Sequence, residues 1–105
     1  GSIVSKTTYH PNGSPQAIMA YLNNVPHGQR RTFHPAGEPE AIEEWQSGRQ
    51  HGTTILYKNG EKYAEVPYES GRRNGLERRF RNGTEIVEEI AWRDNLRHGP
   101  SDTYV

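Results

Sequence analysis

The chain has 105 residues, with thirteen basic and thirteen acidic side chains and no cysteine. Its length suits one domain, and its zero net charge gives no overall field that would favour nucleic acid or an anionic membrane. The lack of cysteine excludes disulfides and thiolate chemistry. Leu, Ile, Val and Phe together contribute only seventeen residues. Ten aromatic residues, each able to bury about 150–250 Å², supply the missing apolar area. We therefore expect a thin core.

The chain begins with Gly1-Ser2 and no initiator Met, which we interpret as a cloning remnant before a domain taken from a longer protein. Residues 1–105 are then predicted to form a single repeat domain. A turn glycine recurs at intervals of 24, 23 and 24 residues, which is typical of a repeat architecture. The repeats are predicted at 5–28, 29–52, 53–75 and 76–99, with a partial copy at 100–105.

Several columns of residues recur in phase with these repeats. The turn glycine and the residue before it are His27-Gly28, His51-Gly52, Asn74-Gly75 and His98-Gly99. One aromatic column precedes this turn and contains Tyr21, Trp45, Tyr68 and Trp92. A second aromatic column contains Tyr9, Phe33, Tyr57, Phe80 and Tyr104. The stretch 44–60 contains these columns in order, and the rest of the chain repeats it with substitutions.

The shorter turns predict β-hairpins. Asn59-Gly60 and Asn82-Gly83 are two-residue loops of the type I′ class, which requires positive φ at both positions. The first two copies are one residue longer, with Pro11-Asn12-Gly13 and Pro35-Ala36-Gly37. That pattern favours a type I turn followed by a left-handed glycine in a bulge.

The longer turns end at the recurring glycine. Their second position is Asn or Gly, the residue types that tolerate the left-handed region. Their first position, Ser47 in the second copy, is expected to have an ordinary β conformation. On this interpretation Gly60→Val should destabilise the protein several times more than Ser47→Val.

The segments between turns are about six to nine residues long and show no helical period, so they are predicted to be strands. Consecutive strands joined by such short turns must pair antiparallel. The expected fold is all-β: a single-layer antiparallel β-meander of about four 23–24-residue β-hairpin repeats. Eight or nine strands at about 4.8 Å each give a sheet about 40 Å wide.

Strand alternation assigns side chains to the two faces of this sheet. The residues two before the first aromatic column are Met19, Glu43, Val66 and Ile90, and those four before it are Ala17, Ala41, Ala64 and Glu88. Both sets share a face with that column, whereas Ile18, Ile42, Glu65 and Glu89 lie on the other face. The strands after the longer turns are rich in arginine, and the strands after the shorter turns are rich in glutamate. Arg and Glu are therefore expected to pair across neighbouring strands.

The unit aromatic-x-[Asn/Ser]-Gly-x-x-His-Gly, followed by an aromatic and a turn glycine, resembles the MORN repeat in its shorter bacterial form. The resemblance covers residues 5–105 and is carried by 21–37, 45–60, 68–83 and 92–104. The first copy departs from it at Asn24 and Pro26, and the third has Asn74 in place of His. The resemblance implies an elongated single-layer sheet with a grooved aromatic face, and no activity. Short chains of this type are labelled antitoxins, and longer relatives are scaffolds, membrane tethers or appendages to enzymes.

The histidine column raises the question of a metal site. Equivalent residues in successive hairpins lie about 9–10 Å apart, whereas zinc ligands lie about 2.0–2.1 Å from the ion. His27, His51 and His98 therefore cannot share one ion, and the same geometry applies to His10 and His34. We expect each imidazole of the column to bond its own turn backbone or to pack beside the next aromatic. No metal or cofactor is expected.

No catalytic constellation is found in the sequence. Adjacent carboxylates in a strand, as at Glu43-Glu44 and Glu88-Glu89, point to opposite faces and cannot act as an acid–base pair. There is neither a phosphate-binding loop leading into a helix nor a nucleophile elbow. The chain is therefore predicted not to be an enzyme, and the sequence indicates no cellular compartment.

Two classes of function remain. The first is recognition of a protein or peptide through the aromatic-lined face, with Tyr21, Trp45, Tyr68 and Trp92 as groove residues. For Tyr9, Phe33, Tyr57 and Phe80 stacking within the sheet is the favoured role. Antitoxin-like neutralisation of a partner toxin is a special case of this class. The alternative is membrane-surface binding through Arg30-Arg31, Arg72-Arg73 and Arg78-Arg79, although interleaved glutamates would cancel much of the attraction.

The C-terminal end of the meander is expected to be an exposed edge. The strand at 100–105 carries Tyr104 and lacks the hairpin partner that a complete repeat would supply. Exposed edges pair readily with other strands. We therefore expect weak homodimerisation through this end, in addition to a protein or peptide partner and with no nucleic-acid partner.

Overall fold

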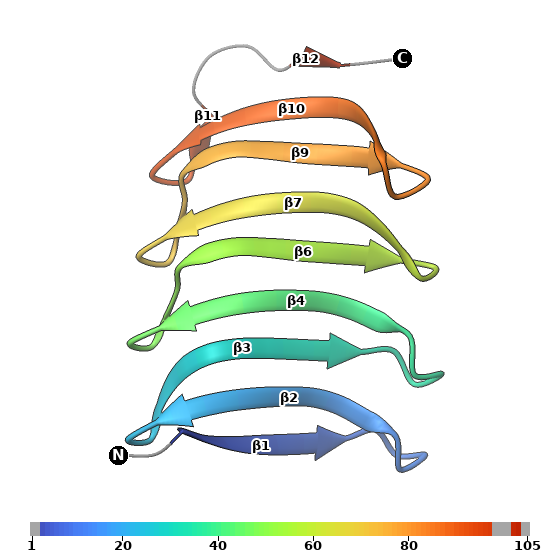
Figure 1. The fold of residues 1–105 in the computed structure, drawn as a ribbon, viewed down its shortest axis with the longest axis vertical. Coiled ribbons are helices and arrows are strands. Elements are labelled where there is room, and N and C mark those ends of the chain that lie inside the picture. Colours follow the sequence, from blue (N-terminus) through green and yellow to red (C-terminus); the bar gives the residue numbers. More distant parts are fainter. Residues whose placement is uncertain (1–2, 98–101, 104–105) are drawn as a thin grey trace.

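The computed structural model describes residues 3–97 and 102–103 and forms one open antiparallel β-sheet in hairpin order (Figure 1). Within this part of the chain, eight strands of seven to nine residues follow one another across the sheet. They are β1 (Ile3–Tyr9), β2 (Pro15–Leu22), β3 (Val25–Phe33), β4 (Pro39–Gln46), β6 (Gly52–Lys58), β7 (Glu61–Glu69), β9 (Gly75–Arg81) and β10 (Glu85–Arg93). Four two-residue segments complete it: β5 (Arg49–Gln50), β8 (Arg72–Arg73), β11 (Leu96–Arg97) and β12 (Asp102–Thr103).

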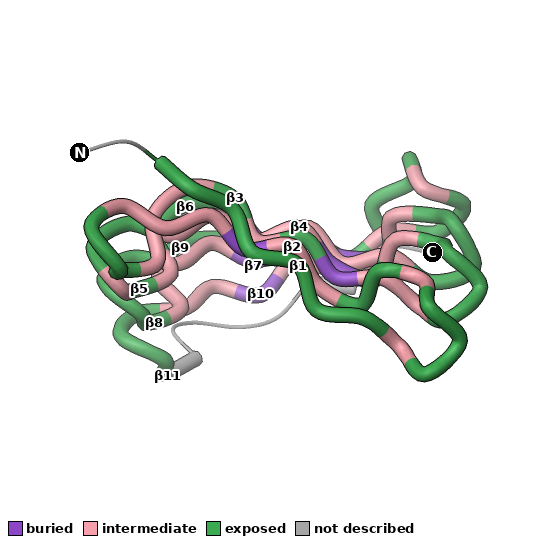
Figure 2. Tube along the Cα trace, turned by 90° about the horizontal axis from the view of Figure 1, so that it is seen from below, coloured by how far each residue is buried: buried purple, intermediate pink, exposed green. Residues whose placement is uncertain are grey.

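The predicted all-β meander is confirmed. The molecule measures 41 × 31 × 18 Å, and its long axis runs across the strands (Figure 1). This is expected for hairpins stacked side by side, because neighbouring strands lie about 4.8 Å apart. Seen end-on, the strands follow one bent layer, with the buried residues confined to its middle (Figure 2). A single layer of this kind has room for only a thin core, in agreement with the composition.

The short turns adopt the predicted conformations. Asn59 and Gly60 have φ of 52° and 78°, as a type I′ turn requires. In the longer variant Gly13 and Gly37 have φ of 90° and 97°, and their amides donate to the carbonyls of His10 and His34. A register shift lies beside this turn, for example between Thr32 and Phe33 at the end of the strand that leads into it. The sequence therefore specified both turn classes correctly.

The expectation for the first position of the longer turns is wrong. Ser47 has φ of 51°, and the equivalent Asn23, Ser70 and Asp94 have φ of 50–52°. With Asn24, Gly48, Gly71 and Asn95 also positive at 66–84°, each longer turn is itself a two-residue loop with both φ positive. Serine was misassigned because it occupies the left-handed region less often than Asn or Gly, and here the hairpin imposes it. Since Ser47 and Gly60 both have positive φ, the expected large difference between their valine variants no longer follows.

The recurring glycine lies after this loop, where the chain kinks into the next long strand. Gly28, Gly52 and Gly75 have φ of 105–119°. An added Cβ at Gly52 would lie 3.1 Å from Cβ of Glu44, a tight contact, and its positive φ disfavours any other residue. Each of these glycines is opposite an aromatic of the next hairpin in register: the pairs are Gly28 with Trp45, Gly52 with Tyr68 and Gly75 with Trp92.

One face of the sheet carries the core, and we call it the core face. Partners directly opposite in an antiparallel sheet share a face. By this rule all eight buried residues of the described chain lie on the face that the alternation assigned. They are Met19, Thr32, Ala41, Thr54, Ala64, Val66, Glu77 and Ile90. The opposite face carries Ile18, Ile42 and Ile55, which are only half-buried.

Successive hairpins are joined at the longer turns by equivalent backbone hydrogen bonds. The amides of Gly48, Gly71 and Asn95 donate to the carbonyls of Pro26, Gln50 and Arg73, at 2.8–2.9 Å. At the other edge Asn12 Nδ2 donates to the carbonyl of Pro35. Each hairpin is thus tied to its neighbours by contacts that repeat with the sequence period, as in other repeat proteins.

The C-terminal edge is described only in part. β12 pairs antiparallel with β10, with Glu88 opposite Thr103 and Glu89 opposite Asp102. The predicted site residues His98, Gly99 and Tyr104 lie outside the described residues, as does most of the segment expected to mediate homodimerisation. That association stays a prediction.

Substitution at Ser47 tests the conformation of the longer turn. Ser47→Val should lower the free energy of unfolding by about 1–2 kcal/mol, because a β-branched residue resists the left-handed region. Ser47→Asn should leave stability unchanged or slightly raised, since Asn23 occupies the equivalent position. Chemical denaturation measures the free energy of unfolding of both variants. The control is Thr53→Val, at an exposed position of β6. Equal midpoints for the two valine variants would contradict the turn assignment.

Deletion of one repeat tests the modular construction of the sheet. Removing residues 53–75 joins Gly52 to Leu76, places Gly52 opposite Trp92 and lets Gln50 accept the amide of Asn95. We expect a folded, less stable sheet, because each hairpin contacts only its neighbours. Removing 53–64 instead reverses the direction of every later strand, so that variant should not fold. Circular dichroism and thermal melting distinguish the two; equally folded deletions would exclude the hairpin as the unit.

Candidate functional site

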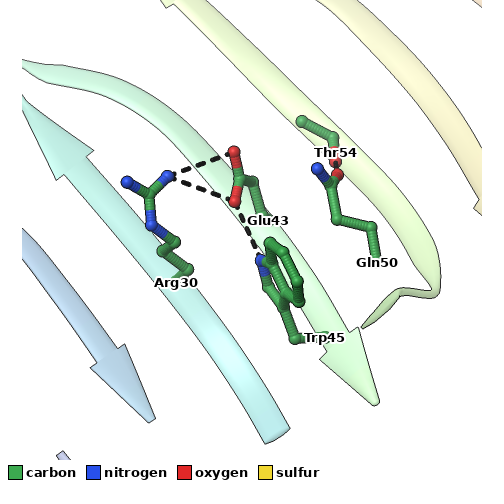
Figure 3. Close-up of polar contacts among 5 residues, drawn as sticks. All are labelled: Arg30, Glu43, Trp45, Gln50 and Thr54. Carbon is green, nitrogen blue, oxygen red and sulfur yellow. Dashed lines mark hydrogen bonds and ion pairs between the residues drawn. The ribbon is translucent and has the colours of Figure 1, made fainter. Parts of the chain in front are cut away.

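A polar cluster lies in the middle of the core face around Trp45 (Figure 3). Arg30 on β3 and Glu43 on β4 are opposite in register, and Nη1 of Arg30 lies 3.3 Å from both carboxylate oxygens. Nε1 of Trp45 donates to Oε1 of Glu43 at 2.8 Å. The hydroxyl of Thr54 donates to Oε1 of Gln50 at 2.9 Å. The indole N–H of Trp45 is thus satisfied within the sheet.

A second cluster repeats this arrangement around Trp92. Glu77 is only 3% exposed, and its two carboxylate oxygens accept from Nε1 of Trp92 at 2.8 Å and from Nε of Arg79 at 2.9 Å. The guanidinium of Arg73 lies 3.7 Å from the centroid of the Trp92 ring, a cation–π contact. A buried carboxylate is tolerated here because both of its oxygens are paired.

The four predicted groove aromatics all lie on the core face near the longer turns. Tyr21, Trp45, Tyr68 and Trp92 are half-buried. Nζ of Lys6 lies 4.8 Å from the Tyr21 ring centroid, so Tyr21 and Trp92 each have a cation over the ring. Together with the two indole hydrogen bonds, these contacts place the row over the core of the sheet. Its role as a set of binding anchors stays a prediction.

The second aromatic column lies near the short turns. Phe33, Tyr57 and Phe80 are half-buried, and Nζ of Lys62 lies 4.2 Å from the Phe80 ring centroid. Tyr9, on the edge strand β1, is 62% exposed and therefore covers little of the sheet. The burial of Phe33, Tyr57 and Phe80 is compatible with stacking within the sheet, whereas the exposure of Tyr9 is not.

The histidine column bonds to the following hairpin and not to its own turn. Nδ1 of His27 accepts from the amide of Ser47, and Nδ1 of His51 accepts from the amide of Ser70, each at 3.4 Å. Of the two predicted arrangements, the bond within the same turn is wrong for His27 and His51, whose imidazoles bond the turn of the next repeat. Packing beside the next aromatic stays a prediction. At the other edge Nε2 of His10 lies 2.8 Å from the carbonyl oxygen of Phe33.

Arg–Glu pairing across neighbouring strands is confirmed. Besides Arg30–Glu43, Nε of Arg78 lies 3.1 Å from Glu89, and Nε of Arg79 lies 3.7 Å from Glu88; each pair is opposite in register. These side chains are partly exposed, so each pair is expected to contribute about 0–1 kcal/mol. The pairs also neutralise charge within each face.

A polar cleft of about 330 Å³ lies on the core face between the first two hairpins, near the short turns. Thr32, which is 8% exposed, lines it, and its hydroxyl has no hydrogen-bond partner among the described residues. Arg30 also lines the cleft, and Nδ1 of His34 lies 3.6 Å from Oε2 of Glu40 at its rim. The remaining lining residues are Thr8, His10, Gln16, Ala17, Phe33 and Pro35.

An apolar cleft of about 760 Å³ occupies the equivalent place between the second and third hairpins. Leu56 stands where Thr32 stands in the first cleft, and Tyr57 stands where Phe33 stands. The other lining residues are His34, Glu40, Ala41, Lys58 and Tyr63. His34 and Glu40 line both clefts. We call the two neighbouring clefts together the short-turn groove.

A comparison with known proteins gives no match: no family model, curated protein or solved structure is significantly similar to this chain. The site must therefore be interpreted from its own geometry.

Sequence reasoning did not identify the short-turn groove. Its central position holds Thr8, Thr32, Leu56 and Arg79 in successive hairpins, so it has no constant residue type to mark a column. Tyr63 is the one aromatic outside both columns, and it lines the apolar cleft. Those two signals, a variable position beside constant ones and an aromatic out of phase, could have located the groove.

Two further observations apply to the part of the chain that the structure describes. It contains no group of three or more His, Asp or Glu side chains gathered so as to hold a metal ion. Nor does it contain a helix long and apolar enough to cross a membrane.

The buried carboxylate of Glu77 provides a test of the Trp92 cluster. Glu77→Ala should lower the free energy of unfolding by about 1–3 kcal/mol, because it leaves the Trp92 N–H without its acceptor and Arg79 without a buried partner. Denaturation followed by tryptophan fluorescence measures the loss. The control is Glu69→Ala, an exposed carboxylate that accepts only from Asn74, and it should change stability little. Indistinguishable midpoints would show that the cluster does not stabilise the sheet.

Proposed function

We propose that this chain is a non-enzymatic recognition module that binds a segment of a partner protein along the short-turn groove. The observation that carries the proposal is the pair of equivalent clefts that share His34 and Glu40. Ligand sites are typically concave and mostly apolar, with a few polar groups that fix orientation. The apolar cleft supplies Leu56, Tyr57 and Tyr63, and the polar cleft supplies Arg30.

The row formed by Tyr21, Trp45, Tyr68 and Trp92 is less suited to binding than the groove. Its indole N–H groups and several of its ring faces are already engaged within the sheet. By contrast, the walls of the apolar cleft are formed by Tyr63, which is 38% exposed, and by half-buried Tyr57. Recognition of this kind agrees with the resemblance to MORN repeats, including an antitoxin-like role towards a partner protein.

Membrane-surface binding receives less support. Neighbouring residues in a strand point to opposite faces, so each of the three arginine pairs is divided between the two sides of the sheet. One or both members of each pair are also engaged, as in Arg30 with Glu43, Arg73 with Trp92 and Arg78 with Glu89. Positive charge therefore does not accumulate on either face.

The proposal is tested by selecting binders from a displayed library of random peptides of about twelve residues on the immobilised protein. The selected peptides should bind the parent chain and lose at least tenfold in affinity for Leu56→Arg, which fills the apolar cleft. Arginine occupies the equivalent position as Arg79, where it pairs with Glu77 and Glu88. Circular dichroism therefore has to show that Leu56→Arg is folded before its affinity is compared. Isothermal titration measures the affinities.

The matched control is Leu76→Arg, which places the same side chain on the opposite face at a leucine that is 43% exposed. Selected peptides should bind this variant as tightly as the parent. Binding that is insensitive to Leu56→Arg, or an empty selection, would contradict the proposal. Co-sedimentation with phosphatidylserine vesicles, if it exceeded peptide binding, would favour the membrane alternative instead.

A further inference from the structure

We infer that the cleft between the second and third longer turns binds a phosphate group, as inorganic phosphate or a phosphate monoester, through the side chains of Arg49 and His51. The longer turns lie along one edge of the sheet and the short turns along the other (Figure 1). This site is therefore separate from the short-turn groove, and the inference does not depend on the proposed function. It follows from a comparison of three equivalent clefts that carry different side chains.

These three clefts follow one another along the longer turns of the described chain. Each is lined by the same columns of one longer turn and by the first loop residue of the next turn. The first is lined by Leu22, Asn23, Val25, His27 and Ser47. The second is lined by Gln46, Ser47, Arg49, His51 and Ser70. The third is lined by Glu69, Ser70, Arg72, Asn74 and Asp94, together with Arg49. The clefts thus share their columns and differ in their side chains.

The second cleft is the one among these three whose charged lining is entirely positive. The first cleft has no acidic or basic lining residue apart from its histidine, and the third mixes arginine with Glu69 and Asp94. Most arginines on the long strands pair with a carboxylate, as Arg30 and Arg78 do. Arg49 is exposed and forms no ion pair with any described residue. Its guanidinium is therefore available to an anion from solution.

His51 adds a hydrogen-bond donor whose tautomer is fixed by the fold. Its Nδ1 accepts from the amide of Ser70 at 3.4 Å, so in the neutral ring the proton is on Nε2. Within the described chain Nε2 has no partner, and His51 is exposed. In the third cleft the equivalent Asn74 donates through Nδ2 to Glu69 at 2.8 Å and is already engaged. The second cleft therefore offers a donor that the third has used.

The remaining lining residues can donate as well. Gln46, Ser47 and Ser70 are exposed, and their side chains have no hydrogen-bond partner among the described residues. The cleft has a volume of about 380 Å³ and is lined by no carboxylate. A phosphate monoester presents three acceptor oxygens and a charge of about −1.5 to −2 at pH 7, and a guanidinium matches its geometry in a bidentate manner. Several donors beside one unpaired cation therefore favour phosphate over a single carboxylate.

An anionic membrane surface fits this edge less well than one isolated phosphate group. Glu69 and Asp94 line the next cleft in the row and would meet the same surface. Their repulsion would offset the attraction of Arg49 and Arg72, because these charges lie within one Debye length of about 8–10 Å of their neighbours. A small phosphate in the second cleft avoids most of this repulsion.

The test is an NMR titration of the 15N-labelled chain with sodium phosphate at fixed pH and fixed ionic strength. The amide signals of Arg49, His51 and Ser70 should shift in a saturable manner. Sodium acetate at the same ionic strength should produce no saturable shift at these residues. A second titration with N-acetyl-phosphoserine amide distinguishes the sources of the phosphate group: tighter binding of this compound indicates a monoester, and weaker binding indicates the free ion.

Variants taken from the neighbouring clefts assign the binding residues. Arg49→Val copies Val25 of the first cleft and should weaken phosphate binding about fivefold or more, with Arg49→Lys intermediate because lysine keeps the charge and loses the fork. His51→Asn copies Asn74 and should weaken binding about two- to fivefold, the effect of one hydrogen bond. The matched control is Arg72→Val, which removes the same charge from the third cleft and should leave the affinity unchanged. Circular dichroism confirms that each variant is folded.

Three results would overturn the inference. The first is the absence of a saturable shift with either phosphate compound. The second is an equal loss of affinity in Arg49→Val and Arg72→Val, which would indicate attraction by general charge and not a site. The third is co-sedimentation of the chain with phosphatidic acid vesicles that both arginine variants reduce alike, in the absence of binding to the soluble phosphates. That result would assign the edge to a membrane surface.

Discussion

The structure depends on one local constraint, the glycine with positive φ that follows each longer turn. At Gly52 the positive φ disfavours any other residue, and the approach of Glu44 leaves little room for a side chain. The chain kinks there, and the residue opposite in register is the aromatic of the next hairpin, Tyr68. The glycine of one repeat is thus paired with the aromatic of the next. The same pairing explains why both columns keep the same period along the sequence.

This dependence between neighbours also shapes the core. A single layer has no second sheet to pack against, so its buried positions are filled by small or polar residues as well as aliphatic ones. Glu43 and Glu77 are accepted in the middle of the core face because Arg and Trp side chains saturate their oxygens. Each tryptophan lies opposite a recurring glycine, and its indole N–H donates to one of these carboxylates. Residues this engaged are poor candidates for capturing a ligand.

The candidate site lies where the repeats differ from one another. The position held by Thr32 and Leu56 has no constant residue type, and its third equivalent, Arg79, forms ion pairs with Glu77 and Glu88. Variation there changes the character of adjacent clefts from polar to apolar without altering the backbone that forms them. A sheet of identical hairpins can thus present a sequence of different clefts at a fixed interval of about 9.5 Å.

The amino-acid sequence by itself determined the all-β meander, its antiparallel pairing, the short turns and which side chains share a face. These features depend on local rules: Asn-Gly loops, period-two alternation and a fixed repeat length. Three features were decided only by tertiary structure. Ser47 has positive φ because the hairpin closure imposes it against the preference of serine. His27 and His51 bond to the next repeat because the kink at the glycine directs them there. The short-turn groove arises from residues on three neighbouring strands, Thr32, Ala41 and Leu56, whose proximity is set by strand register and not by any pattern along the chain.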